Sequence, residues 1–293
     1  MQFVDVTNDI AFRKIFGNEN KKVILISFLN AVLDLHGESR IVYVEMMNPF
    51  QLPIIRNLKA SIVDLRARDE SGKTFVIEMQ VSEPEGLDKR LLYYVSKDYV
   101  NQIKVGDEYQ ALKPIIFIGI FDFEFTHSNK YVSHHGYCDV ENGDRVLKDI
   151  DFYFVELPKF NKKLEDIEAI QDKWIFFIKE AENLDLIPEN LNDEGLAEAY
   201  QDAAKFNWTQ EELREYDYAA MREQDLRGVK ALAVKRAAEA AKAEGKAEGI
   251  EVGARETERK IVRLQASQGK TIQEIAQNTG LSVERIAALL AEK

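Results

Sequence analysis

The feature that most constrains the fold is a pair of segments, on either side of a turn, in which apolar and polar residues alternate. The segments are 59–68, Lys-Ala-Ser-Ile-Val-Asp-Leu-Arg-Ala-Arg, and 74–81, Thr-Phe-Val-Ile-Glu-Met-Gln-Val. Alternation with a period of two is typical of strands, and the intervening run 69–73 is rich in turn-forming residues. The sequence therefore predicts a β-hairpin.

This hairpin brings two carboxylates together. Folding it about the middle of the turn places Asp64 directly opposite Glu78, so their Cβ atoms are expected about 5 Å apart. Gln80 follows on the same face. Directly opposed like charges destabilise a sheet unless they share a cation, so the pair predicts a divalent-metal site. The alternative is a solvated face on which Arg66 and Arg68 neutralise the acids in weak surface ion pairs.

Composition restricts the class of protein. A chain of 293 residues with 16 Phe and 11 Tyr suits one large domain with an appendage, or two domains. The net charge of −12 argues against nonspecific coating of nucleic acid, but a nuclease that neutralises its carboxylates with metal remains compatible. The single cysteine, the absence of a signal-peptide pattern and the lack of a long apolar stretch predict a cytoplasmic protein.

The remaining elements describe a sheet covered by helices. Apolar residues recur at helical spacing over 7–35 and 87–104. Strands are predicted at 40–47 and 151–157, and the continuous apolar run 114–123 is typical of a strand buried on both faces. The order helix, strand, hairpin, helix, strand, strand predicts a mixed central sheet flanked by helices, of class α/β or α+β.

Beyond the sheet the chain is expected to be helical, over 163–182 and 195–226. From about 229 to 266 it is rich in Ala, Glu, Lys and Arg without Pro or aromatic residues, which marks a domain boundary and either a long polar helix or a mobile connector. Small residues recur there at every fourth position from Ala233 to Gly253. Such a stripe allows helices to self-associate, whereas glycines that each weaken a helix by about 1 kcal/mol favour a tether.

The last segment has clear helix-end signals. Thr271 and Glu274 form a capping box, Gly280 ends the first helix and Ser282 caps the second. The segment is similar to the first two helices of a helix-turn-helix. Since a DNA-reading helix needs a basic surface and the basic side chains here are matched by glutamates, a structural helical hairpin is favoured.

A run of potential metal ligands lies at His134-His-Gly-Tyr-Cys-Asp139. Its spacing matches no structural-zinc pattern and a second Cys/His pair is missing, so the run predicts a loop.

The spacing of Asp64, Glu78 and Gln80 resembles the PD-(D/E)xK nuclease core, with Ile-Val-Asp at 62–64 and Glu-Met-Gln at 78–80 in place of its two elements. Over about residues 5–160 the chain resembles the PD-(D/E)xK family transposases, which include recombination-promoting nucleases, and its C-terminal helices fit the usual tail of that family. The resemblance implies a restriction-endonuclease-like core with an all-helical C-terminal extension. Five segments carry it: Asp9–Phe16, Lys59–Asp69, Ile77–Gln80, Arg90–Tyr94 and Gly106–Tyr109.

The resemblance also implies a Mg²⁺-dependent endonuclease, with Mn²⁺ as a substitute, that hydrolyses DNA phosphodiester bonds and promotes recombination or transposition. Asp64, Glu78 and Gln80 would be catalytic, and Asp64 and Glu78 would hold the metal with the backbone carbonyl of Met79. Gln80 stands where the name-giving motif has Lys. An amide orients water but carries no charge and is no base at neutral pH, so weak activity is expected.

Three further residues are candidates for this site. Asp9 would supply a third carboxylate from the first helix, or would instead be the N-cap of that helix beside Asn8. Arg90 and Tyr94 lie one turn apart and would contact phosphate. Alternatively they are an arginine that extends along apolar surface to water and a half-buried tyrosine.

The predicted organisation has four parts: a nuclease-like core at 1–160, a helical extension packed on it at 161–228, an Ala/Gly-rich helix or linker at 229–266 and the helical hairpin at 267–293. A dimer through the C-terminal helices is expected, because cutting both strands of DNA favours two active sites. The alternatives are a non-catalytic DNA-binding or regulatory protein with a decayed nuclease site, and an interaction module that assembles through its small-residue helix.

Overall fold

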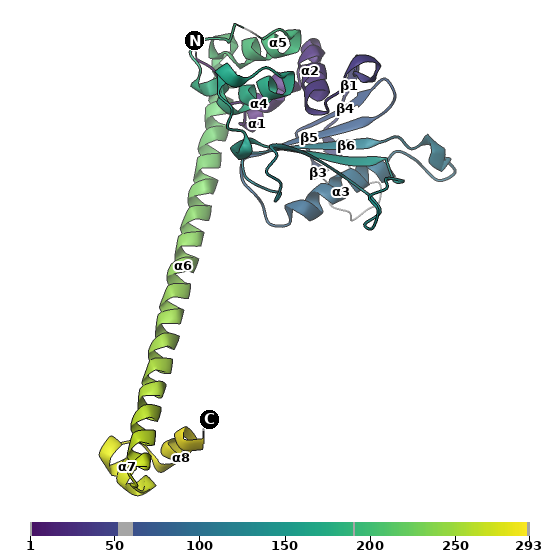
Figure 1. Ribbon diagram of the computed structural model, residues 1–293. Coiled ribbons are helices and arrows are strands. Elements are labelled where there is room, and N and C mark those ends of the chain that lie inside the picture. Colours follow the sequence, from purple (N-terminus) through teal and green to yellow (C-terminus); the bar gives the residue numbers. More distant parts are fainter. Residues whose placement is uncertain (1, 52–60, 190, 292–293) are drawn as a thin grey trace. The chain divides into compact units, whose positions relative to one another are not determined.

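In the computed structural model, the centre of the fold is a six-stranded mixed sheet (Figure 1). Its lateral order is β1-β4-β5-β6-β8-β7, in which β5, β6 and β8 are parallel and the other neighbours are antiparallel. This sheet confirms the predicted mixed fold class. The strands are β1 Val44–Met47, β4 Leu65–Asp69, β5 Thr74–Gln80, β6 Ile115–Phe121, β7 Val132–Gly136 and β8 Ile150–Glu156.

The structure describes residues 2–51, 61–189 and 191–291. The chain divides into two units, residues 1–223 and 224–293, of which the first holds the sheet. In the described ranges, no helix is both long enough and apolar enough to cross a membrane.

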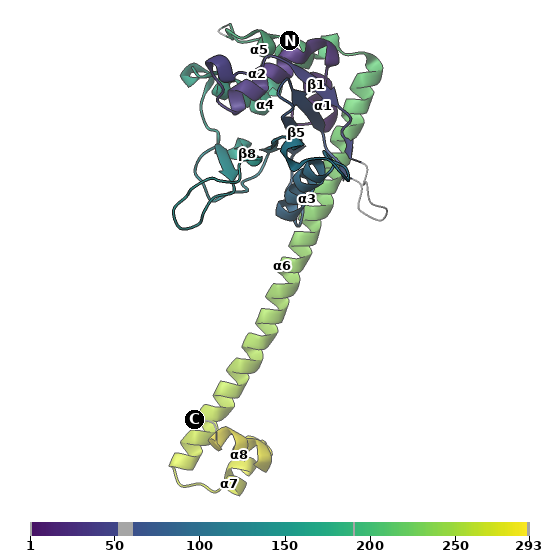
Figure 2. The same cartoon turned by 90° about the vertical axis from the view of Figure 1, so that its right-hand side faces the viewer.

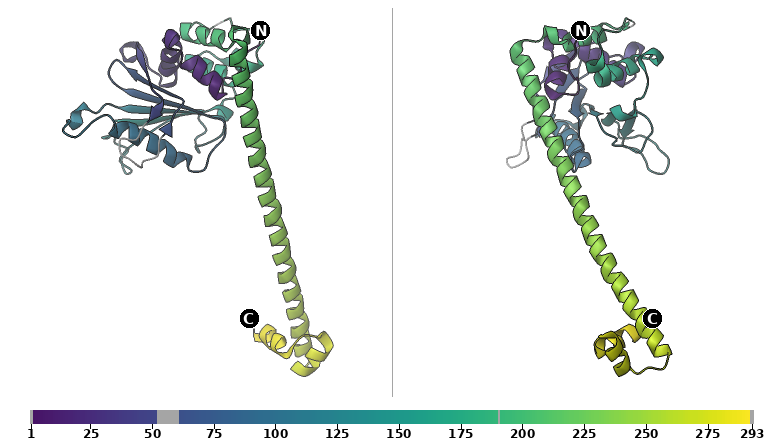
Figure 3. Two further views of the ribbon diagram at one scale, coloured as in Figure 1. Left: turned by 180° about the vertical axis from the view of Figure 1, so that it is seen from behind. Right: turned by 90° about the vertical axis from the view of Figure 1, so that its left-hand side faces the viewer.

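Helices cover both faces of the sheet, as Figures 1 and 3 show. On one face, α3 Leu87–Val100 packs through Leu87, Leu91 and Val95. On the other face lie α1 Asp9–Phe16, α2 Lys22–Val32, α4 Ile170–Glu180 and α5 Glu194–Ala203, around the buried Trp174. Alternate residues of β5 and β6 belong to the two cores, so β6 is buried along its whole length as its apolar run predicts.

The predicted first strand of the hairpin is not continuous. Its first two residues lie outside the described ranges, β3 Ser61–Ile62 pairs with β2 Phe50–Gln51 in a separate two-stranded sheet, and β4 begins only at Leu65. The chain bends at Asp64, where the carboxylate accepts the backbone N–H of Met79 at 2.8 Å. A side-chain oxygen thus takes the place of a backbone partner, which explains why the period-two pattern hides the break.

The prediction of a loop at His134 is wrong for its first half, since His134, His135 and Gly136 form the end of the edge strand β7. The reason is pairing with β8: the His134 ring stacks on Tyr153 at 4.3 Å between centroids. The His134 ring also contacts Asp151, with 2.7 Å between His134 Nε2 and Asp151 Oδ1. These contacts come from a strand that lies elsewhere in the sequence.

The polar segment at 229–266 is helical rather than a connector. It lies within α6 Gln210–Ser267, so the predicted boundary near 228 falls inside one helix. The four-part division of the chain stays a prediction.

The second unit closes on a small core of its own, as seen in Figure 2, where α7 Ile272–Thr279 and α8 Val283–Ala291 lie beside the end of α6. Four side chains form this core: Val262, Ile275, Ile286 and Leu289. The capping box of Thr271 and Glu274 is present, and Gly280 ends α7 with φ +71. Helix ends predicted from local sequence are therefore confirmed here.

Candidate functional site

The predicted pairing of the two carboxylates is present. The register of β4 and β5 sets Leu65 against Ile77, so the next position along brings Asp64 level with Glu78. Both side chains are buried, with exposed fractions of 8% for Asp64 and 4% for Glu78. The alternative of a solvated hairpin face is therefore wrong.

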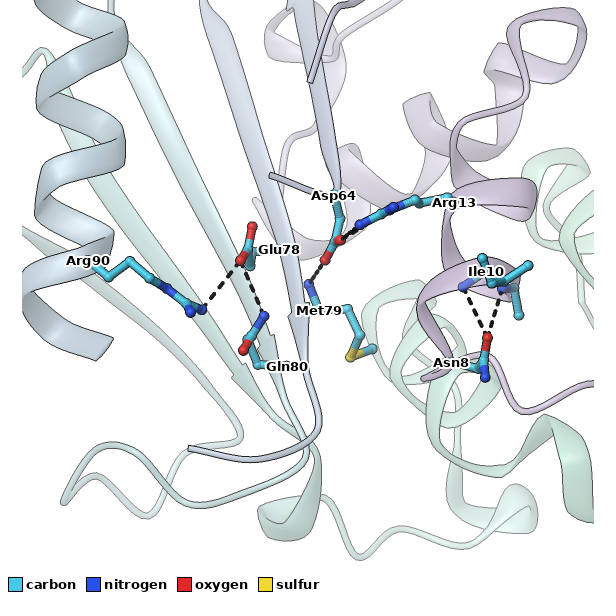
Figure 4. A network of polar contacts seen from close by, with 9 residues as sticks. Asn8, Ile10, Arg13, Asp64, Glu78, Met79, Gln80 and Arg90 are labelled. Carbon is cyan, nitrogen blue, oxygen red and sulfur yellow. Dashed lines mark hydrogen bonds and ion pairs between the residues drawn. The ribbon is translucent and has the colours of Figure 1, made fainter. Parts of the chain in front are cut away.

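Glu78 points toward α3 and shares one oxygen between two donors (Figure 4). Gln80 Nε2 donates to Glu78 Oε1 at 3.2 Å, and Arg90 Nη2 lies 3.4 Å from the same oxygen. The second oxygen, Oε2, is buried and accepts no hydrogen bond of normal geometry from the residues that the structure describes, although the backbone N–H of Asp64 acts on this carboxyl group. A buried acceptor without a partner is unfavourable, so this atom is the one that a ligand would satisfy.

Burial raises the pKa of Glu78 to about 8, and the negative charge of Asp64 acts in the same direction. The charge of Arg90, the backbone N–H of Asp64 and the charge of Arg13 lower this pKa but do not cancel the effect. Gly119 is level with Glu78 in the parallel register, and the rings of Phe121 and Phe117 fill the space that a side chain at Gly119 would need. Burial beside Asp64 therefore favours the protonated form of Glu78 when no cation is bound.

Asp64 is held by an arginine that the sequence argument did not single out. Arg13 donates from Nε at 3.2 Å and from Nη2 at 2.7 Å, both to Asp64 Oδ1. Asn8 caps α1 by accepting the N–H groups of Ile10 and Ala11, and this cap sets the helix turn from which Arg13 extends. The only local signal for Arg13 is its position four residues after Asp9 on α1.

Asp9 is the first residue of α1 and is exposed. The N-cap is Asn8, so the alternative that assigned the cap to Asp9 is wrong. Its charge helps to raise the pKa of Arg13, although burial acts against that increase and the bonds to Asp64 contribute more. Over the residues that the structure describes, no three His, Cys, Asp or Glu side chains gather closely enough to hold a metal ion. The third-carboxylate role stays a prediction.

Arg90 and Tyr94 both lie on the part of α3 that faces the acids. The Arg90 guanidinium is 5.7 Å from the centroid of the Tyr94 ring and pairs with Glu78. Burial and the charge of Glu78 raise the pKa of Tyr94. Arg90 therefore points into the site, with its buried Nε left unbonded, rather than along the helix toward water.

Arg66 does not neutralise the acids in the way that the alternative required. Arg66 donates instead to both oxygens of Asp98 on α3, at 3.0 and 2.5 Å, and to the backbone oxygen of Asn48. Positive charge reaches the carboxylates from Arg13 and Arg90, which belong to helices on opposite faces of the sheet.

The donors present fit a divalent cation such as Mg²⁺. This ion is commonly bound through one or two carboxylates together with water and substrate phosphate. Glu78 offers a buried oxygen without a partner, and a cation there would oppose the two influences that raise the Glu78 pKa. Met79 turns its side chain into the opposite core, so only its backbone is directed to the hairpin.

Comparison with known proteins gives one match. A family model described as PD-(D/E)XK nuclease family transposase matches residues 6–233, which is more than half of the chain and includes the whole sheet. A search of curated proteins found no match, and a search of solved structures also found none.

Proposed function

The chain belongs to the PD-(D/E)XK nuclease family transposases, and on that premise we propose that it is a metal-dependent endonuclease that hydrolyses DNA phosphodiester bonds during recombination or transposition. One observation supports this most strongly. Asp64 and Glu78 are level on a hairpin and buried, and Glu78 keeps an oxygen without a partner. Two adjacent buried acids are unfavourable for folding, and a cation bound by both would offset that cost.

In this proposal Asp64 and Glu78 hold Mg²⁺ or Mn²⁺, with the backbone carbonyl of Met79 as a further ligand. The bound ion would polarise the phosphate and favour ionisation of an attacking water. The Asp64 carboxylate is oriented by the Met79 N–H at 2.8 Å, so one ligand is fixed in place by the strand that carries the other.

Gln80 and Arg90 have separate tasks in this mechanism. The Gln80 amide, which lies 3.2 Å from Glu78 Oε1, orients the water by hydrogen bonds but does not take its proton. Arg90 supplies the positive charge that the Lys of the family motif would carry, because its guanidinium lies beside the same oxygen. Together with Tyr94, Arg90 contacts the phosphate backbone of DNA.

A second candidate is a non-catalytic DNA-binding or assembly protein with a decayed site. The contacts that favour it are the two arginines on the two carboxylates, together with the loss of the motif lysine at Gln80. Ion pairs of this kind hold a fold together without any metal.

We also propose that the protein dimerises through its C-terminal helices. Several large apolar side chains of α6 are 44–68% exposed and would be covered in a dimer: Val229, Leu232, Val234, Ile250, Val252, Ile261 and Leu264. In the terminal hairpin, Arg285 pairs with Glu258 at 3.0 Å, which supports a structural role for that hairpin over DNA reading.

The experiment that tests the enzyme is nicking of supercoiled plasmid with Mg²⁺ or Mn²⁺. Asp64→Asn and Glu78→Gln keep the size of each side chain and remove its charge, and both are expected to abolish nicking. Glu70→Gln is the matched control, because Glu70 is an exposed acid in the turn of the same hairpin. If the metal-dependent nicking is absent, or equal in all four proteins, the nuclease proposal fails and the second candidate is favoured.

A further inference from the structure

The two arginines at the carboxylate pair differ in how they are held. Arg90 contacts Glu78 through one nitrogen at 3.4 Å and is 31% exposed, whereas Arg13 places two nitrogens on Asp64 Oδ1 and is 45% exposed. Figure 4 shows that the Arg13 side chain extends from α1 to the Asp64 carboxylate on the side away from Arg90. Arg13 is therefore the better bonded of the two and also the more accessible.

The oxygens of Asp64 are already occupied by protein donors. Oδ2 accepts the Met79 N–H, and Oδ1 accepts both Arg13 nitrogens, which fills its two lone-pair positions. A cation that binds Oδ1 must displace the guanidinium. One that binds the remaining lone pair of Oδ2 would lie beside a positive charge and be repelled by it.

The Arg13 side chain extends from a helix whose backbone is separately hydrogen-bonded. The Arg13 backbone oxygen accepts the N–H of Gly17 at 2.9 Å, so displacing the guanidinium breaks no backbone hydrogen bond of α1. Asp9 lies four residues earlier on the same helix, is exposed, and already acts electrostatically on Arg13. The released guanidinium therefore has an acid within reach on its own helix.

From these contacts we propose that Arg13 is a stand-in cation for the metal ion. It neutralises Asp64 while the protein is free of metal, and it is displaced when the ion binds, so that arginine and ion compete for one carboxylate. This inference rests on the proposed metal site. It assigns Arg13 a positioning role, namely to keep two facing acids compatible with the fold until metal arrives, at the expense of metal affinity.

The test is Mn²⁺ binding to the full chain without DNA, measured by titration calorimetry or by the electron paramagnetic resonance signal of free Mn²⁺. Arg13→Gln removes the competing charge and is expected to tighten Mn²⁺ binding about 10-fold. Lys14→Gln is the matched control: it removes the same charge from the next residue of α1, where Lys14 pairs with Glu212 instead. Its Mn²⁺ affinity is expected to stay within about 2-fold of wild type.

The outcomes separate this inference from the proposed function. If wild type binds Mn²⁺ and Arg13→Gln binds it equally or more weakly, the competition is wrong while the nuclease proposal stands. If neither protein binds Mn²⁺, both ideas fail. If circular dichroism shows that Arg13→Gln does not fold, Arg13→Lys replaces it in the test. This variant loses the two-nitrogen contact and is expected to tighten Mn²⁺ binding by a smaller factor. Unchanged Mn²⁺ affinity of Arg13→Lys would overturn the proposed competition.

Discussion

Glu78 and Asp64 are two acids that share a buried place in the sheet, and the protein accommodates them by different means. Asp64 is bonded by Arg13 and by a backbone N–H. Glu78 has a pKa of about 8, because it is buried and lies beside Asp64. Two carboxyl groups with different environments are a common arrangement where acid–base or metal chemistry takes place.

The raised pKa of Glu78 predicts a pH dependence of stability in the metal-free protein. Because the folded-state pKa of about 8 lies above the ordinary 4.5, this group's contribution is complete below pH 4.5 and is lost as the pH rises to 8. The free energy of unfolding should fall by up to about 1.4 kcal/mol per pH unit in that window. Glu78→Gln should remove this slope in urea unfolding with EDTA. Parallel curves for the two proteins would contradict the prediction.

Gly119 beside Glu78 predicts a packing effect. A Cβ there would lie 2.8 Å from Phe121 Cε1 and 3.1 Å from Phe117 Cε1, and both rings are fully buried. Gly119→Ala should lower the free energy of unfolding by about 1–3 kcal/mol. The control is Gly228→Ala in α6. Apart from the backbone of its own helix, no atom of the described residues lies within 4 Å of the added Cβ, so this change should raise helix stability by up to about 1 kcal/mol. Equal unfolding midpoints for the two variants would refute the crowding argument.

Among the elements, β4 connects several parts of the fold. It pairs with β1 and β5, it begins immediately after the bend at Asp64, and its Arg66 ties it to α3 through Asp98. The side chain of Asp98 is 3% exposed and that of Arg66 is 13% exposed. The position of Asp64 opposite Glu78 therefore depends also on the buried ion pair of Arg66 and Asp98.

This arrangement predicts different effects for the two arginines of β4. Arg66→Ala removes the guanidinium that donates to both oxygens of the buried Asp98, which should destabilise the fold by about 3–5 kcal/mol. Arg68→Ala is the control from the same strand and should change stability by less than about 1 kcal/mol, as is usual for a partly exposed charge. The free energy of unfolding of both variants is measured by chemical unfolding. An equal decrease in both would show that the ion pair of Arg66 and Asp98 contributes no more to stability than Arg68 does.

At the scale of the whole molecule, the chain consists of two units with separate cores, and α6 carries residues of both. The exposed apolar residues of α6 remain uncovered within a single chain. These side chains stand singly among polar residues, and the proposed dimer would cover those that share one side of the helix.

The proposed dimer predicts a change in mass on substitution in α6. Leu232→Gln together with Ile250→Gln should shift the protein from dimer to monomer in sedimentation velocity, since these side chains are 49% and 64% exposed in the single chain. Glu239→Gln, a polar change between them, should leave the dimer intact. A monomeric wild type at micromolar concentration would exclude dimerisation through this helix.

The sequence alone determined those features that repeat within one element or lie at its ends. The period of two and the turn at 69–73 set Asp64 level with Glu78, the apolar run at 114–123 identified the buried strand, and the capping box at Thr271 marked a helix start. These patterns are local, because backbone geometry fixes which side chains share a face and which groups need a cap.

Only the tertiary structure decided which groups meet from distant parts of the chain. Arg13 reaches Asp64 across 51 residues of sequence, Arg66 turns to α3 instead of the acids, and His134 lies in a strand because β8 is beside it. The pKa of Glu78 is likewise raised by burial, which the packing of the sheet produces. No periodic pattern encodes such contacts, because they arise from how the elements pack. The sequence identifies a carboxyl group, but the groups packed around it set its pKa.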